Sequence, residues 1–172
     1  DLRATEYRPQ LNAVSVDIET DHHASTLYSI GIYSDDVSIV YMVGPTEDSI
    51  EQTHDGGNLE LCQLNSEREV ISAFVKKILD LDPDVIMGWN IVNFDLRCLQ
   101  KFCDRLKMPF LLGRNNEPIS WRKERDSNDR YYALLPGRVV LDGIELMRSA
   151  TYQFENFSLE SVSRQLLDRG KL

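Results

Sequence analysis

The stretch 13–20, Ala-Val-Ser-Val-Asp-Ile-Glu-Thr, constrains the fold more than any other part of the sequence. β-Branched residues alternate with small or polar ones, which is typical of a strand with one buried face. Successive side chains of a strand point to opposite faces, so Asp17 and Glu19 share one face and the apolar residues share the other. The sequence therefore predicts a strand over about 12–20 that carries two acids on one face.

Two carboxylates this close on one strand are costly, because like charges raise each other's pKa unless a cation neutralises them. A divalent metal such as Mg²⁺, which takes oxygen ligands, is a common reason for such a pair. The alternative is a strand that runs into solvent with two hydrated acids. Asp-x-Glu is a short pattern, so it needs a second signal before it indicates a metal site.

A second informative pattern, Asn90-x-x-x-Phe94-Asp95, follows the short apolar run 85–87. That run suits a strand buried on both faces, and a helix is expected after it. A carboxylate at a helix N-terminus is favoured in its charged form, and open α/β sheets place ligand crevices at the carboxyl ends of strands. If this strand lies beside the one at 12–20, Asp95 faces the first acidic pair. The alternative is an ordinary first-turn acid, with Asn90 as a turn former.

Hydrophobic patterning predicts that the remaining segments form an α/β domain with a mixed sheet. Further strands are expected at 27–33, 37–43, 59–64, 85–87 and 138–141. The turn at 34–36 joins two of them into a hairpin, so the first three strands run antiparallel. The turn formers and acids of 44–58 predict a mobile loop.

Helical spacing and capping residues predict four helices. Ser66 and Glu69 form a capping box at the start of the first helix. The helices are expected from Ser66 to about residue 80, from about Asp95 to before Pro109, around 144–147, and from Ser158 onward. Pro109 cannot continue the second helix, because its ring removes a backbone donor. The inner face of the last helix is predicted to contain Leu159, Val162 and Leu166.

The composition is that of a globular but acidic domain. Hydrophobic residues make up 42% of the chain and charged residues 27%, which argues against disorder. The formal net charge of -9 argues against nucleic-acid binding by general basicity, so a phosphodiester substrate would need metals or a local basic patch. The three cysteines form no Cys-x-x-Cys pair, which is typical of a reduced intracellular protein. No apolar run has the length of a membrane helix.

Taken together, Asp-Ile-Glu-Thr at 17–20 and Asn-x-x-x-Phe-Asp at 90–95 resemble, in order and spacing, the 3′–5′ proofreading exonuclease domain of family B DNA polymerases. The segments 139–143 and 157–162 look like later parts of that domain. Their amino-acid sequences are most similar to those of bacterial members of the family. The resemblance implies an α/β fold with a ribonuclease H-like mixed sheet and helices on both faces.

The resemblance also implies roles for individual residues. Catalysis and the binding of two divalent metal ions, Mg²⁺ or Mn²⁺, would depend on Asp17, Glu19 and Asp95. The 3′ end of single-stranded DNA would be held by Thr20, Asn90, Phe94, Ser158 and Leu159. Plain core packing is the competing interpretation of Phe94 and Leu159.

The polar segment 113–137 combines cations with aromatic rings in an otherwise acidic chain. Cations follow a phosphate backbone, and rings stack on unpaired bases. By resemblance, the segment lies where family members carry a β-hairpin that helps to separate the primer strand from its template. The DNA contacts would come from Trp121, Arg122, Lys123, Arg125 and Arg130. A solvated surface loop is the alternative.

One motif of the family is missing. The third motif, Tyr-x-x-x-Asp, which supplies a fourth carboxylate, occurs nowhere in the sequence. We therefore expect an exonuclease domain at 11–172 that stops before its third motif. Residues 1–10 are expected to form a linker that leads in from a preceding region. Asp142 is a possible neighbour of the site rather than a direct ligand. The fragment alone would be inactive or weakly active.

The function expected from the resemblance is proofreading by a DNA-directed DNA polymerase in replication and repair. The domain would hydrolyse the 3′-terminal phosphodiester of single-stranded or frayed DNA by a two-metal mechanism. The expected partners are a single-stranded 3′ end, the remaining polymerase domains and a sliding clamp, with no membrane, in the bacterial cytoplasm near the nucleoid. Two alternatives stay open: an inert DNA-binding or scaffold domain of the same fold, and a related RNA-trimming exonuclease.

Overall fold

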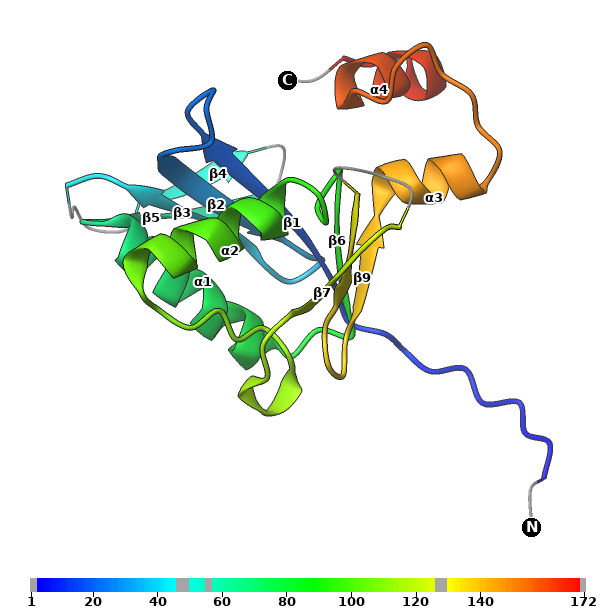
Figure 1. Cartoon of the computed structure of the whole chain (residues 1–172), viewed down its shortest axis with the longest axis horizontal. Coiled ribbons are helices and arrows are strands. Elements are labelled where there is room, and N and C mark those ends of the chain that lie inside the picture. Colours follow the sequence, from blue (N-terminus) through cyan, green and yellow to red (C-terminus); the bar gives the residue numbers. More distant parts are fainter. Residues whose placement is uncertain (1–2, 46–49, 55–56, 126–129, 171–172) are drawn as a thin grey trace.

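A seven-stranded mixed sheet forms the centre of the molecule, with strand order β4-β5-β3-β2-β1-β6-β9 (Figure 1). The computed structural model describes residues 3–45, 50–54, 57–125 and 130–170. The strands of the sheet are β1 (Ala13–Thr20), β2 (Leu27–Tyr33), β3 (Ser38–Val43), β4 (Ile50–His54), β5 (Gly57–Leu64), β6 (Val85–Gly88) and β9 (Val139–Asp142). β1, β2 and β3 run antiparallel in succession, whereas β6 runs parallel to both β1 and β9. The predicted mixed sheet with an antiparallel opening is confirmed.

The prediction of a loop over 44–58 is wrong for much of the part that the structure describes. Ile50–His54 form β4, and β5 begins at Gly57. β5 pairs in parallel with β3 and antiparallel with β4. The pairing of β5 with β3 joins strands that are not consecutive in the chain, so local turn propensity does not reveal it. Residues 46–49 and 55–56 lie outside the described residues.

Four helices accompany the sheet in the described chain, each where the sequence predicts one. They are α1 (Glu67–Leu81), α2 (Asp95–Leu106), α3 (Gly143–Ser149) and α4 (Leu159–Leu167). The Ser66 hydroxyl accepts a hydrogen bond from the Glu69 amide at 3.3 Å, which confirms the N-cap of α1. Ser158 caps α4 in the same way, accepting from the Ser161 amide at 3.2 Å.

The main core lies between one face of the sheet and the helices α1 and α2. Alternate residues of β1 (Val14, Val16 and Ile18) are buried on this face. They belong to the same packed cluster as apolar side chains of the two helices, among them Val70, Ile71, Phe74, Leu96, Leu99 and Phe102. Cys98 and Cys103 are free thiols in this core. No helix in the described chain is long and apolar enough to span a membrane.

The helices α3 and α4 border the other face of the sheet, so helices lie on both faces. Ser15, Met87 and Leu141 are in register across β1, β6 and β9. These three side chains line one pocket together with Leu146 of α3 and Leu159 of α4. Figure 1 shows α4 beyond α3, apart from the main body of the sheet.

The prediction for the inner face of α4 is right for one residue only. Val162 is 3% exposed, whereas Leu159 and Leu166 are 41% and 44% exposed. The helix is amphipathic, but little of its apolar side meets the rest of the described chain. Helical spacing predicts which residues share a face, and tertiary packing decides how much of that face is covered.

Residues 120–134 add a second, two-stranded sheet. β7 (Ser120–Lys123) and β8 (Tyr131–Leu134) pair antiparallel, with Trp121 opposite Ala133. A 3-10 turn, Arg114–Asn116, precedes them. The segment 113–137 is therefore built around an ordered strand pair, the form that the resemblance implies.

Candidate active site

Asp95 joins the first residue of α2 to the acidic end of β1. Its Oδ1 accepts a hydrogen bond from the backbone amide of Ile18 at 3.0 Å, and the side chain is 1% exposed. β6 pairs with β1 only as far as Ser15, so beyond that point Asp95 supplies an acceptor on this side of β1. The two sequence patterns that lie about 70 residues apart therefore meet in space.

Asp17 directly precedes Ile18, so the hydrogen bond from the Ile18 amide brings Asp95 close to Asp17. Burial of the carboxyl, and then the negative charge of Asp17, raise the pKa of Asp95 from 3.8 to about 7. The side chain of Asp17 is exposed, so the pair has one buried and one exposed carboxyl. A nearby cation would stabilise both charged forms and lower the raised pKa.

Glu19 lies two residues along β1 from Asp17, and it is also exposed. Side-chain alternation places these two acids on the same face of the strand. Within the described ranges, no three Asp, Glu, His or Cys side chains are grouped closely enough to hold a metal ion. The structure thus brings Asp17 and Asp95 together, and it does not add Glu19 to them as a finished three-ligand site. The donor set is nonetheless all carboxylate oxygen, which suits Mg²⁺ or Mn²⁺.

Asp142 holds the loop that leads to Asp95. It is 5% exposed, and its Oδ2 accepts from the Val92 amide at 3.0 Å while its Oδ1 accepts from the Ile144 amide at 3.0 Å. Burial raises the pKa of Asp142, and its backbone hydrogen bonds, including one from Asn90, oppose that rise. One carboxylate therefore ties the β6–α2 loop to the start of α3. From the sequence, Asp142 is predicted only as a possible neighbour of the site, and this clamp is not predicted.

Three of the residues predicted to hold DNA, Thr20, Asn90 and Ser158, form hydrogen bonds with neighbouring residues of the chain. Asn90 has φ 60°, a left-handed conformation that Asn adopts readily, and its carbonyl accepts from the Phe94 amide at 2.9 Å. Thr20 donates its hydroxyl to the Asp21 carbonyl at 2.9 Å. The hydroxyl of Ser158 donates to Asn156 Oδ1 at 2.6 Å besides capping α4. These three residues thus have clear local structural roles.

Phe94 and Leu159 are not simple core residues. They are 38% and 41% exposed, so each keeps a large apolar surface available. Leu159 lines a pocket of about 440 Å³ on the second face of the sheet, with Asp17 in the same lining. The remaining walls come from β1, β6, β9 and α3, with Met87, Trp89, Leu141 and Leu146 among the lining residues. The pocket therefore places an apolar surface beside one member of the acidic pair.

Gly88 allows the closest approach of two backbones beside this pocket. A Cβ atom at this position would lie 2.6 Å from the carbonyl oxygen of Val16, closer than real Cβ contacts. The neighbouring Trp89 donates its indole N–H to the Phe157 carbonyl at 3.0 Å. This bond ties the start of the β6–α2 loop to the segment just before Ser158.

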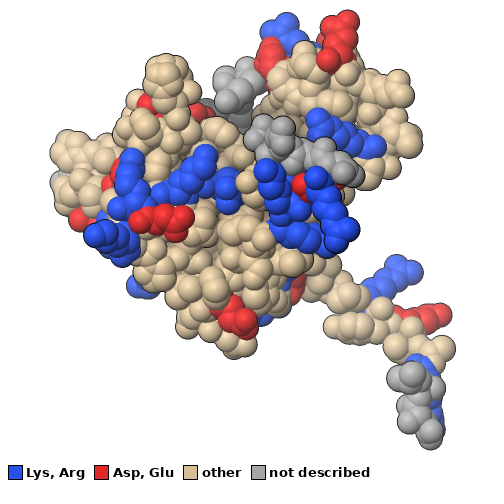
Figure 2. Space-filling view, viewed as in Figure 1, with Lys and Arg blue, Asp and Glu red and all other residues tan. Residues whose placement is uncertain are grey.

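The five hairpin residues named from the sequence have different surroundings. Arg122 stacks over the Tyr132 ring at 4.8 Å, and Lys123 and Arg125 are exposed. Arg130 instead forms ion pairs with Glu124 and Glu145, and Trp121 is half-buried. Figure 2 shows Lys and Arg side chains gathered in a band across this face of an otherwise acidic molecule.

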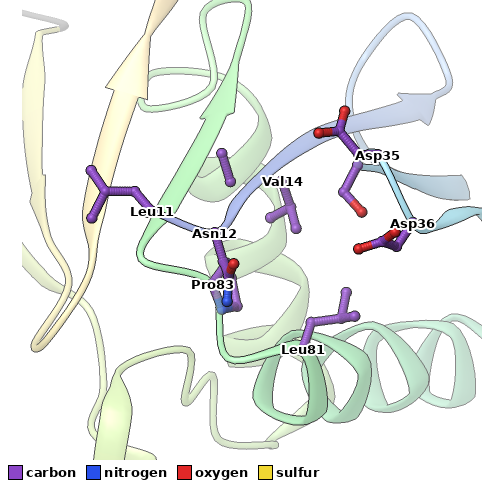
Figure 3. Close-up of a pocket in the computed structure, with 9 residues that line it drawn as sticks. Leu11, Asn12, Val14, Asp35, Asp36, Leu81 and Pro83 are labelled. Carbon is purple, nitrogen blue, oxygen red and sulfur yellow. The ribbon is translucent and has the colours of Figure 1, made fainter. Parts of the chain in front are cut away.

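A second pocket, of about 200 Å³, lies at the start of β1, at the opposite end of the strand from Thr20 (Figure 3). It is lined by Leu11, Asn12, Val14, Leu81 and Pro83, with Asp35 and Asp36 from the β2–β3 turn. None of the residues predicted to act on DNA lies there. The acidic pair and the apolar pocket are therefore the candidate active site.

Comparison with known proteins shows which family the chain belongs to. Residues 2–162 match the family described as DNA polymerase family B, exonuclease domain. DNA polymerase II of Escherichia coli (strain K12) is 41% identical over 166 residues, which cover 96% of this chain and 21% of that protein. The DNA polymerase of Thermococcus kodakarensis is 27% identical over 94% of this chain and 9% of its own length. The DNA polymerase delta catalytic subunit of Schizosaccharomyces pombe is 30% identical over 65% of this chain and 11% of its own length.

The match confirms the resemblance, including the likeness to a bacterial polymerase II. The chain spans about a fifth of the length of the E. coli protein, and less of the other two. The match extends through both acidic patterns and through Asp142. This chain belongs to the family B DNA polymerase exonuclease domains.

Proposed function

We propose that this domain is the proofreading 3′–5′ exonuclease of a DNA-directed DNA polymerase, and that it acts in replication and repair. The observation that supports this best is the meeting of Asp17 with Asp95. A buried carboxyl with a raised pKa, placed beside an exposed carboxylate, is an arrangement found at functional sites. An inert scaffold would gain nothing from such repulsion.

Two divalent metal ions, Mg²⁺ or Mn²⁺, would be held by Asp17, Glu19 and Asp95. The substrate and a fourth carboxylate, other than these three, would supply the further ligands. Such ions supply a reactive water and stabilise the attacking and leaving oxygens of a phosphodiester. Within the chain, the Ile18 amide fixes the Asp95 carboxyl, and Asp142 fixes the loop before it. These contacts orient the ligands before substrate arrives. Since the sequence contains no Tyr-x-x-x-Asp motif to supply a fourth carboxylate, the domain by itself would be inactive or weakly active.

The substrate is proposed to be the 3′ end of single-stranded or frayed DNA. The exposed ring of Phe94 and the apolar pocket with Leu159 offer surfaces on which a base can stack, whatever its identity. Thr20, Asn90 and Ser158 would contact the sugar and phosphate near that end. A mismatched terminus frays more readily than a paired one, so it reaches such a site more often.

The β7–β8 hairpin is proposed to contact DNA next to the site. Arg122, Lys123 and Arg125 are exposed, whereas Trp121 and Arg130 mainly hold the hairpin in place. The partners would be the other domains of the polymerase and a sliding clamp. The location that fits is the bacterial cytoplasm, near the nucleoid.

The test is an exonuclease assay on the intact polymerase with matched single-stranded DNA and RNA. We expect Asp17→Asn to lower DNA degradation by about 10²–10³, since it removes a charge that acts in the transition state. Polymerisation should be unchanged. Asp35→Asn, an exposed acid of the second pocket, is the control and should behave like the wild type.

The same assay separates the alternatives. A wild-type protein that degrades neither strand would indicate a scaffold domain. Faster degradation of RNA than of DNA would indicate an RNA-trimming enzyme. Full activity of the Asp17→Asn variant would refute the assignment of the acidic pair.

A further inference from the structure

Helix α2 carries a row of cations that the sequence analysis did not single out. Arg97 and Lys101 are four residues apart, so they lie on the same side of the helix, about 6 Å apart along its axis. Arg105 continues the row, but it forms an ion pair with Glu67. The row starts two residues after Asp95 and runs away from the acidic pair.

The β7–β8 hairpin packs against α2 beside this row of cations. The guanidinium of Arg97 lies 4.2 Å from the centroid of the Tyr131 ring and 5.0 Å from that of Trp121. The Trp121 indole N–H also donates to Gln100 Oε1 at 3.3 Å. The hairpin is therefore docked on α2 through the face that carries Trp121 and Tyr131. Side-chain alternation places the exposed Lys123 on this same face, next to the cations of the helix. We call Arg97, Lys101 and Lys123 the basic band.

The basic band is not neutralised from within the described chain. None of its three cations forms an ion pair with another described residue, whereas the nearby Arg105 and Arg130 are both paired with glutamates. The whole chain has a net charge of -9, so this group of cations is a local departure from its acidic character. Like charges repel, and this repulsion is relieved when an anion binds between them.

We infer that the basic band binds the phosphates of a single DNA strand that leads away from the acidic pair. This inference rests on the proposed function for the position of the 3′ end. The half-buried rings of Trp121 and Tyr131, which lie beside Arg97, add surfaces for unpaired bases. This combination of uncompensated cations and rings favours a single strand over an acidic protein segment, which offers no bases to stack.

The experiment compares two double variants of the intact polymerase. Lys101→Gln with Lys123→Gln removes two charges from the basic band. Lys76→Gln with Lys77→Gln removes two charges from α1, outside the band, and is the matched control. Binding of single-stranded DNA of about 16 nucleotides is measured over a salt series with EDTA present, so no hydrolysis occurs.

We expect the band variant to bind more weakly, with a salt slope smaller by about 1.4, which is about 0.7 for each phosphate that a lysine no longer neutralises. The control should keep the wild-type slope. A trinucleotide, which occupies only the acidic site, should bind all three proteins equally.

Equal slopes for the band variant and the control would overturn the inference, as would an equal loss of trinucleotide binding. A lower unfolding temperature for the band variant alone would also overturn it, because the band would then pack against another part of the polymerase. Since binding is measured without metal, an inactive wild-type enzyme would refute the proposed hydrolysis and leave this test valid.

Discussion

The backbone amide of Ile18 donates a hydrogen bond to the carboxylate of Asp95 at 3.0 Å, and so links the first strand to the second helix. The bond holds a buried acid beside Asp17, where its charged form is disfavoured. In the absence of metal, the domain therefore keeps a carboxyl that the fold stabilises better when it is protonated.

The first prediction concerns pH. The pKa of Asp95 is raised from 3.8 to about 7, so between these values the folded state binds a proton that the unfolded state has released. Stability of the metal-free domain should therefore fall as pH rises from about 4 to about 7. Asp95→Asn keeps an oxygen for the Ile18 amide but removes the charge, so it should flatten this part of the profile. Urea unfolding at several pH values measures the difference, and parallel profiles for the two proteins would contradict it.

The second prediction concerns metal binding. The described residues bring together two acids rather than a three-ligand site, so the domain without DNA should bind Mn²⁺ weakly. Titration calorimetry should detect this weak binding, and Asp17→Ala should abolish it. Asp35→Ala, in the β2–β3 turn, serves as the control. Submicromolar binding that survives Asp17→Ala would place the metal elsewhere.

The third prediction concerns the Asp142 clamp. Asp142→Asn has one acceptor oxygen in place of two, and its amide would face the Val92 or the Ile144 N–H group. A buried donor left without an acceptor should reduce the free energy of unfolding by about 1–3 kcal/mol. Because the loop before Asp95 is released, kcat for DNA hydrolysis should also fall. Asp104→Asn, an exposed acid on α2, is the control, and a variant with wild-type stability and kcat would show that the clamp is dispensable.

The fourth prediction concerns the hairpin. Replacing Arg122 and Arg125 by Ala should slow removal of a 3′ end from paired duplex more than from single-stranded DNA, because the hairpin would act on strand separation. Single-turnover rates on the two substrates measure this ratio. Arg164→Ala on α4, which removes an exposed cation paired with Glu160, is the control. An unchanged ratio in the hairpin variant would leave the segment as a surface element without this role.

The sequence alone determined the local features. The alternation around Asp17 predicted β1, the turn at 34–36 predicted the β2–β3 hairpin, and the caps Ser66 and Ser158 predicted two helix starts. These features depend on neighbouring residues, because side-chain alternation and capping act over a few positions of the chain.

Only the tertiary structure decided the rest. The pairing of β5 with β3, the clamp of Asp142 on the Val92 amide, and the exposure of Leu159 each depend on segments that are distant in sequence. The basic band on α2 and the hairpin also appears only after folding, since the composition reports a net negative charge. Local patterns fix which way a side chain points within its own element. Which other element it then meets is set by packing over the whole chain, and that packing turned two separate acidic patterns into one site.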